Sequence, residues 1–247
     1  MQKDIRDIEE GLTSSDVEVR RRWGENLGFQ PTYEQIERGL TDWEISIRWT
    51  WADRMDFTPT PEQIERGLTD EDEDVRQTWA ERMDFTPTPE QIERGLLDPQ
   101  WEVRYAWAKR EDYTPTHLQI ERGLTDNALS VKKVWIQRQD YLPDPKQVDR
   151  GQIEGQSLER LWWSERMDFT PTPKQIERGL TDSYDVVRVN WALRMNYTPT
   201  SEQVQRGLSD MSKRVREAWQ QRMKHMMQEC LENVDVLSYD AFSGSVL

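Results

Sequence analysis

The chain has 247 residues, of which 35% are hydrophobic and 32% are charged, and its formal net charge is −14. Its 12 tryptophans and 9 methionines provide enough apolar material for a packed core, which excludes a disordered chain. The negative charge argues against general binding to nucleic acid or to anionic membranes, because both need lysine and arginine to neutralise phosphates. Partners with a basic or neutral surface are favoured.

The sequence shows no sign of export or of membrane insertion. The first residues, MQKDIRDIEEGL, lack the apolar segment of a secretory signal, and no later stretch approaches the roughly 18 uninterrupted apolar residues that would span a bilayer. Cys230 is the only cysteine, which excludes an intramolecular disulfide and a multi-thiolate metal site. A soluble, cytoplasmic protein is predicted.

A 28-residue repeat organises the chain from its first residues onward. Glycine recurs at this spacing, as Gly11, Gly39, Gly67, Gly95, Gly123, Gly151, Gly179 and Gly207. Tryptophan follows each glycine by twelve residues, as Trp23, Trp51, Trp79, Trp107, Trp135, Trp163, Trp191 and Trp219. Eight tandem repeats are therefore predicted.

The first helix of a repeat is predicted from a capping pattern that is clear around Gly67. Thr60 precedes Pro61 and is a natural N-cap residue, and Gln63 completes a capping box. Gly67 has two interpretations. It ends this short helix in a left-handed conformation, or it lies inside the helix where a neighbouring backbone passes closely.

The second helix of the same repeat is predicted to follow Asp70 as its N-cap, with an acidic first turn that suits the helix dipole. Val75, Trp79 and Met83 are four residues apart, so one helix face should be apolar and face the core. Two helices in 28 residues cannot bury that face alone, so successive pairs must stack. The predicted fold is an all-α solenoid of eight two-helix repeats.

The repeat pattern weakens in the middle of the chain. The segment NALSVKKVW at 127–135 has lost its acidic residues and carries Lys132 and Lys133. The next repeat has Gln152 in place of leucine and Glu159 in place of valine. Either the pattern has drifted here or the surface is adapted to a partner, and the second interpretation makes Lys132 and Lys133 candidate binding residues.

The pattern ends near residue 224. Residues 1–224 are therefore predicted to form the solenoid domain, and residues 225–247 to form a C-terminal cap and tail. A cap is expected because the last repeat would otherwise expose its apolar side.

The recurring D-x-x-x-x-V-R-x-x-W-A, followed by a T-P connector and a short apolar helix, resembles HEAT-type repeats over about residues 5–223. It is especially similar to the leucine-rich repeat variant. Tryptophan stands here where those repeats usually carry a smaller apolar residue, and the cysteines of the iron–sulfur module found with some of them are missing. The resemblance implies a solenoid with a binding surface, without a redox role and without a named ligand.

Two ladders of basic residues border the tryptophan row. They are expected to cover the tryptophan rings with their stems and to pair with the aspartates of adjacent repeats. The alternative is a row of arginines that lines a concave groove and binds an acidic peptide or nucleic acid. The first ladder lies nine residues after each glycine, as Arg20, Arg48, Arg76, Arg104, Lys132, Arg160, Arg188 and Arg216. The second lies three residues after tryptophan, as Arg54, Arg82, Arg110, Arg138, Arg166, Arg194 and Arg222.

An acidic run, TDEDED at 69–74, supplies candidate binding residues. It is either the solvated first turn of a helix or an epitope for a basic partner. A complete DNA mimic would carry more charge than −14 over eight repeats, because B-DNA has about six charges per 10 Å. The hypothesis of DNA mimicry is therefore restricted to one acidic edge of the protein that imitates phosphates locally. The candidates are Asp70, Glu71, Asp72, Glu73 and Asp74.

Four tryptophans, Trp43, Trp49, Trp101 and Trp162, stand outside the ladder. Trp49 is two residues before Trp51, about 160° around a helix, so it should point away from the core. An exposed tryptophan often marks an interface, and packing against a neighbouring helix is the alternative. Trp49, Trp101 and Trp162 are therefore candidate binding residues.

No pattern typical of catalysis is present. His117 and His225 are the only histidines, and the sequence has no phosphate-binding loop, no dinucleotide fingerprint and no nucleophile with an identifiable base. We expect a non-enzymatic monomer without metal or cofactor.

The function predicted from these observations is binding to a protein partner with a basic surface, as an acidic inhibitor or adaptor. A nucleic-acid-handling protein is a suitable partner, and a phage-type anti-defence inhibitor fits the description. A structural or self-assembling repeat protein is the alternative from another class, and the arginine-lined groove is a third.

Overall fold

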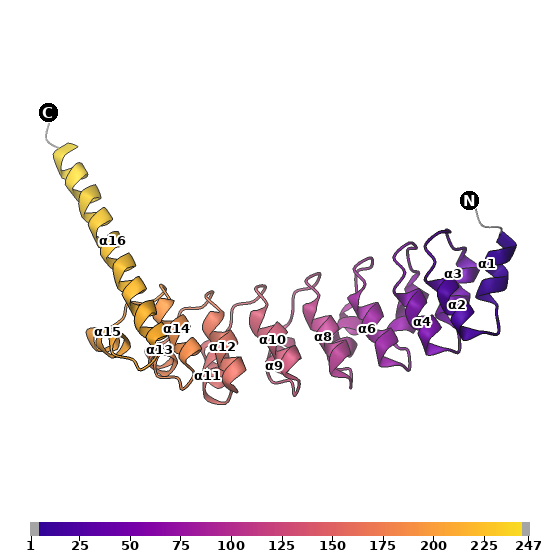
Figure 1. The fold of residues 1–247 in the computed structure, drawn as a ribbon, viewed down its shortest axis with the longest axis horizontal. Helices are drawn as coiled ribbons and strands as arrows, with labels where there is room; N and C mark the ends of the chain where they lie inside the picture. Colours follow the sequence, from indigo (N-terminus) through magenta and orange to yellow (C-terminus); the bar gives the residue numbers. More distant parts are fainter. Residues whose placement is uncertain (1–4, 244–247) are drawn as a thin grey trace. The chain divides into compact units, whose positions relative to one another are not determined.

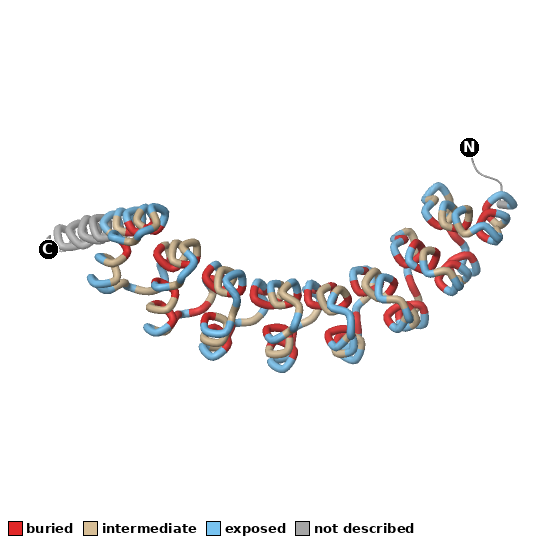
Figure 2. Tube along the Cα trace, turned by 60° about the horizontal axis from the view of Figure 1, so that its bottom comes forward, coloured by how far each residue is buried: buried red, intermediate tan, exposed pale blue. Residues whose placement is uncertain are grey.

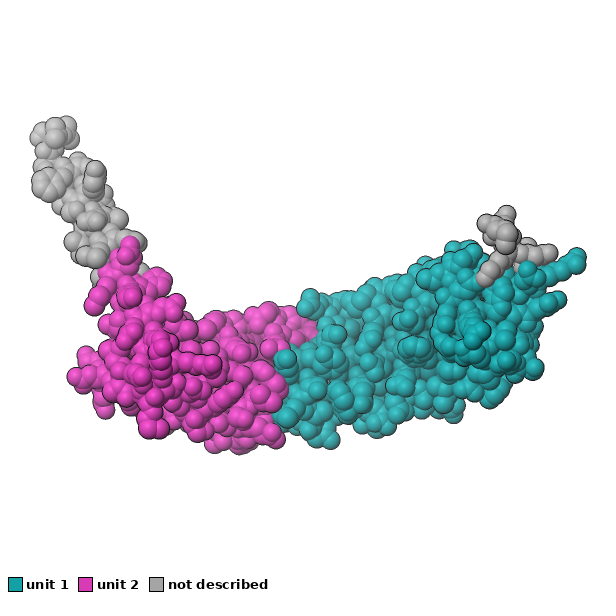
Figure 3. Space-filling view, in the orientation of Figure 1, with its two compact units in different colours: residues 1–135 teal, residues 136–247 magenta. Residues whose placement is uncertain are grey.

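The computed structural model describes the backbone of residues 5–243 and the side chains of residues 6–228. This part of the chain forms sixteen α-helices and no strand (Figure 1). It divides into two compact units, residues 1–135 and residues 136–247, which Figure 3 colours separately. The predicted all-α fold of tandem two-helix repeats is confirmed, and the predicted domain division after residue 224 stays a prediction.

Every repeat consists of a short first helix and a second helix. The first helices are α1 (Ile5–Leu12), α3 (Tyr33–Leu40), α5 (Pro61–Leu68), α7 (Pro89–Leu96), α9 (His117–Leu124), α11 (Pro145–Ile153), α13 (Pro173–Leu180) and α15 (Ser201–Leu208). The second helices are α2 (Val17–Gly24), α4 (Ile45–Ala52), α6 (Glu73–Glu81), α8 (Trp101–Lys109), α10 (Leu129–Gln137), α12 (Ser157–Glu165), α14 (Asp185–Leu193) and α16 (Lys213–Ser243). Within the described residues, no helix has the length and apolarity needed to cross a bilayer.

The second helices pack on one another to form a continuous layer within each unit. In the first unit α4 lies between α2 and α6, and α6 packs in turn on α8; in the second unit α14 lies between α12 and α16. First helices pack on the second helix of their own repeat, as α5 does on α6 and α13 does on α14. Buried residues, red in Figure 2, recur in each repeat where these helices meet. Stacking of incomplete pairs, which the sequence predicts, is therefore what builds the core.

The first helices begin as their sequence predicts. The Thr60 hydroxyl accepts a hydrogen bond from the Gln63 main-chain N–H at 3.3 Å, and the Gln63 side chain accepts one from the Thr60 N–H at 2.9 Å. Pro61 occupies the first turn, where the missing N–H costs nothing. The capping box satisfies two N–H groups that have no partner within the helix.

The ladder glycines lie inside the first helices, and none of the described glycines has a positive φ. The close neighbour at each is the ladder tryptophan twelve residues later. A Cβ added at Gly67 would lie 2.1 Å from Trp79 Nε1, and one added at Gly95 would lie 2.0 Å from Trp107 Nε1. Of the two interpretations of Gly67, the close approach is correct, and an indole ring rather than a neighbouring backbone makes it.

Two local predictions for the third repeat are wrong. The N-cap of α6 is Asp72, whose carboxylate accepts the Asp74 and Val75 N–H groups, and Asp70 lies one short turn earlier. Val75 and Trp79 are buried as predicted, but Met83 is 59% exposed. The cause is the end of α6 at Glu81, because the chain beyond it no longer follows the helical period.

The repeat of the second unit that departs from the pattern, with Gln152 and Glu159, buries both of these polar side chains. Gln152 is buried and donates from Nε2 to the carbonyl of Gln175 at 3.3 Å. Glu159 is also buried, and it accepts the Gln156 N–H at 2.9 Å as part of a capping box. Both replacements therefore form hydrogen bonds within the stack.

The predicted C-terminal cap begins within α16, which runs without interruption from the eighth repeat to Ser243. The side chains after residue 228, that of Cys230 among them, and the end of the predicted tail at 244–247 lie outside the described residues.

Candidate functional site

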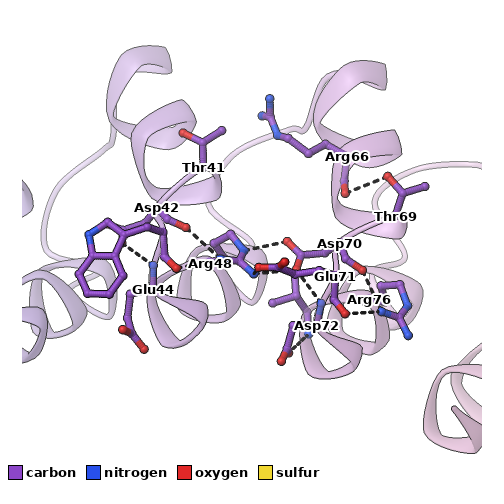
Figure 4. Close-up of polar contacts among 12 residues, drawn as sticks. Thr41, Asp42, Glu44, Arg48, Arg66, Thr69, Asp70, Glu71, Asp72 and Arg76 are labelled. Carbon is purple, nitrogen blue, oxygen red and sulfur yellow. Dashed lines mark hydrogen bonds and ion pairs between the residues drawn. The ribbon is translucent and has the colours of Figure 1, made fainter.

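The first arginine ladder forms ion pairs that tie consecutive repeats together within each unit, as Figure 4 shows for Arg48 and Asp70. Arg48 Nε and Nη2 donate to the two carboxylate oxygens of Asp70 at 2.8 and 2.9 Å, while Nη1 donates to the carbonyl of Asp42 at 3.0 Å. Both side chains of the pair are 9% exposed. These hydrogen bonds with Asp70 raise the pKa of Arg48 above its ordinary value. The planar guanidinium suits this bidentate geometry.

The same pair recurs in both units, so the predicted pairing with aspartates of adjacent repeats is confirmed for six of the eight members of this ladder. In each pair the aspartate belongs to the next repeat along the chain. The pairs are Arg20–Asp42, Arg48–Asp70, Arg76–Asp98, Arg104–Asp126, Arg160–Asp182 and Arg188–Asp210.

The second ladder also serves the stack, but through contacts different from those predicted. Arg82 Nη1 donates to the carbonyls of Ala52 and Arg54, at the C-terminal end of α4, at 2.7 and 2.6 Å. Its Nε and Nη2 bind the carboxylate of Asp84, two residues later, rather than an aspartate of an adjacent repeat. The guanidinium carbon lies 5.0 Å from the Trp79 ring centroid, so the guanidinium group lies over the indole, where the stem was predicted. A cation at helix carbonyls is favourable because those groups have no partner within the helix.

A third ladder of ion pairs, which was not predicted from the sequence, joins the first helices. Arg66 Nη2 donates to the Glu37 carboxylate of the preceding repeat at 2.9 Å, and Gln63 donates to the same carboxylate at 2.6 Å. In the next repeat, hydrogen bonds from Arg94 and Gln91 lower the pKa of Glu65. The available signal was the Gln-Ile-Glu-Arg-Gly segment, which repeats the same three polar residues every 28 positions.

The five acidic candidates have different environments. Asp70 belongs to the ion pair with Arg48, and Asp72 is the N-cap of α6. Glu71 has a side chain that is 83% exposed and lies 3.3 Å from Arg48 Nη2. Glu73 and Asp74 are exposed in the first turn of α6. Only Glu71, Glu73 and Asp74 therefore present carboxylates outward.

Two tryptophan candidates lie on either side of that acidic helix. Trp49 on α4 is 43% exposed, which confirms that it points away from the core, and Trp101 on α8 is 41% exposed. Trp162 is half-buried on α12, in the other unit. Trp49, Trp101 and the acidic residues of α6 therefore lie on three second helices of the first unit that pack side by side, in the order α4, α6 and α8.

The lysine candidates belong to α10. Lys132 is half-buried and Lys133 is exposed, and both take part in polar interactions. The groove hypothesis requires a row of arginines that face outward. The ion-paired arginines of the first two ladders do not supply it, because their guanidinium groups are turned into the stack.

A small pocket opens between α6 and α8. It has a volume of about 270 Å³ and is lined by Glu81, Met83, Ala106, Lys109 and Arg110. Small-molecule sites usually occupy about 300–1,000 Å³, so this space suits a single side chain better than a cofactor. Ala106 is the smallest of its lining residues, and the equivalent positions of the neighbouring repeats hold the larger Thr78 and Val134.

Comparison with family models finds no match for the chain, and neither does comparison with curated proteins. Among solved structures, the chain is similar to a leucine-rich repeat variant described as having a novel repetitive structural motif. The TM-score is 0.63 at 21% identity, over 86% of this chain and 78% of that one. At this identity the likeness establishes the fold alone: the chain is a helical tandem-repeat protein with the architecture seen in that variant.

Proposed function

We propose that this chain is a protein-binding repeat protein whose acidic surface engages a basic region of a partner, as an inhibitor or adaptor. The observation that carries the proposal is the engagement of arginines within the stack. In the ion pairs of the first two ladders, the arginine side chains are no more than 20% exposed. These cations are therefore withdrawn from the surface.

Carboxylates, in contrast to these arginines, remain exposed at the surface. Glu73, Asp74 and Glu81 are exposed on α6, and the net charge of the whole chain is −14. A surface of this sign attracts a basic partner over a distance set by the ionic strength and repels phosphate backbones. The nucleic-acid groove of a DNA- or RNA-handling protein is a basic surface of this kind, which makes an inhibitor of such a protein the specific form of the proposal.

Retention of defined proteins on the immobilised chain tests the proposal. We expect basic proteins to be retained at about 0.1 M salt and released towards about 1 M, as the Debye length falls from about 10 to about 3 Å. Acidic proteins and oligonucleotides should pass through. Retention of acidic proteins that withstands high salt would contradict the role of charge.

Self-assembly is tested separately by light scattering over a concentration series. A constant mass near 29.5 kDa is expected for the binding protein. A mass that grows with concentration would support a structural, self-assembling role instead.

A further inference from the structure

The first unit presents a surface that none of the three ladders uses. It is formed by α4, α6 and α8, which pack in that order. We call it the α4–α6–α8 face and define it by Trp49 on α4, Glu73 and Glu81 on α6, and Trp101 and Tyr105 on α8. Trp49 and Tyr105 occupy the same register two repeats apart, and Glu73 and Trp101 share another register one repeat apart. The stacking that aligns the repeats therefore aligns these side chains.

The two tryptophans of this face are exposed to a ligand. Trp49 and Trp101 are each more than 40% exposed, although an apolar ring of this size is normally buried. Trp101 lies edge-to-face with Tyr105 at 6.3 Å between ring centroids. The Lys109 ammonium lies 5.4 Å from the Tyr105 centroid, so this aromatic group already receives a cation from its own helix.

Between the two aromatic helices the face is acidic. Glu73 and Glu81 are exposed at the two ends of α6, and Glu81 also lines the pocket between α6 and α8. Aromatic faces and carboxylates both favour cations, the first through the ring quadrupole and the second through charge. A phosphate backbone would meet repulsion from the same carboxylates.

We propose that the α4–α6–α8 face binds an extended, lysine- and arginine-rich segment of a partner protein. This inference rests on the proposed function and names the surface and the chemistry of the partner. Packed helices lie about 8–10 Å apart, so Trp49 and Tyr105 are about 16–20 Å apart across α6. An extended segment of about five or six residues spans that distance at about 3.3 Å per residue.

Each part of the face has a role in this arrangement. The aromatic groups on α4 and α8 stack on cationic side chains at the two ends of the segment. Glu73 and Glu81 pair with the basic residues between them. The pocket beside Glu81 receives only the apolar stem of one long side chain, because Met83 and Ala106 provide an apolar wall. Lys109 and Arg110 also line the pocket, so the cationic end of that side chain stays outside, beside the Glu81 carboxylate.

The test uses the full chain and a short fluorescein-labelled lysine–arginine peptide, with Kd measured by fluorescence anisotropy at about 0.1 M salt. Two substitutions each remove one of the side chains that define the face, and neither is expected to disturb the fold. Trp49→Gln introduces the residue found at the same register in α6, namely Gln77, and Glu81→Gln removes one charge. Each is expected to raise Kd by about tenfold, as losses of cation–π and charge contacts at an interface do.

Glu165→Gln is the matched control. Glu165 is exposed and occupies on α12 the register that Glu81 occupies on α6, so its replacement changes the net charge equally outside the face. This control should leave Kd unchanged. Circular dichroism melting of all three variants verifies that they fold.

The outcomes separate this inference from the proposed function. Equal weakening by Glu81→Gln and Glu165→Gln, or an unchanged Kd for Trp49→Gln, would overturn the face while leaving an acidic binding protein in place. Failure of the peptide to bind a chain that retains basic proteins would also overturn it, because the partner surface would then not be an extended segment. A chain that neither binds the peptide nor retains basic proteins would reject the proposed function as well. Tight binding of an oligonucleotide of equal length, sensitive to Trp49→Gln, would reject the basic peptide as the occupant.

Discussion

The indole ring of Trp79 lies directly against the backbone of Gly67. A Cβ on that glycine would be 2.1 Å from Trp79 Nε1, and Trp79 is 1% exposed. The ring therefore occupies the space that any other residue's side chain would need. This contact joins the two helices of a repeat, and the other ladder glycines have the same relationship to their tryptophans.

Gly67→Ala should destabilise the protein in spite of the better helix propensity of alanine. Overpacking in a filled core costs about 1–3 kcal/mol, and a Cβ only 2.1 Å from Trp79 Nε1 places this cost towards the upper end, above the roughly 1 kcal/mol that alanine gains over glycine inside a helix. Urea unfolding measures the difference. In a Trp79→Leu background the added methyl group has room, so the two substitutions should be clearly non-additive. Additive effects would mean that the two residues do not share this space.

Trp107→Ala should lower the free energy of unfolding by about 3–5 kcal/mol, the range for removing a large aromatic side chain from a core. Trp107 is 2% exposed, whereas Trp101 on the same helix is 41% exposed. Trp101→Ala is therefore the matched control and should cost much less. Similar midpoints of thermal unfolding for both variants would contradict the assignment of the ladder tryptophans to the core.

Arg48→Lys should destabilise the stack although it keeps the charge. Lysine cannot make the bidentate contact with Asp70 and reach the Asp42 carbonyl at the same time, so we expect a loss of about 2–3 kcal/mol. Arg22→Lys is the control, because the Arg22 side chain is 71% exposed in its ion pair with Glu18. Chemical denaturation compares the two, and equal small losses would show that the ladder contributes little to stability.

Acid should weaken the same ladder at its last described pair. Hydrogen bonds from Arg188, and then from the Ser212 N–H, lower the pKa of Asp210 in the folded chain. A carboxyl with a lowered folded pKa contributes stability that is fully present above its unfolded pKa of about 3.9 and is lost as the pH falls through the folded value. Unfolding free energies measured from pH 7 to pH 3 should show this loss.

Asp210→Asn isolates the contribution of that carboxyl. The variant should be less stable than the parent at pH 7, and the difference should shrink below about pH 4. Glu202→Gln removes an equal charge from an exposed position in the same repeat, so it controls for the change in net charge. A difference between Asp210→Asn and the parent that stayed constant with pH would contradict the role of the ion pair.

The sequence alone determined the features that depend on neighbours in the chain and on the repeat period. Thr60 and Gln63 are three residues apart, so their capping box forms within one turn and can be predicted locally. The tryptophan ladder indicated the core because a side chain repeated in every unit must occupy the same place in the stack. Pairing of Arg48 with Asp70 followed from the same logic.

The tertiary structure decided what depends on how helices approach one another. Whether Gly67 ends its helix or admits Trp79 depends on the distance between α5 and α6, and either outcome is compatible with the local sequence. Arg66 and Glu37 are 29 residues apart, and they meet only because consecutive first helices stack in register. Helical periodicity predicted that Trp49 points away from the core, but only the packed neighbours decided that no other described helix covers it and that it stays 43% exposed. Local hydrogen bonds act within a few residues of chain, whereas burial is a property of the assembled stack.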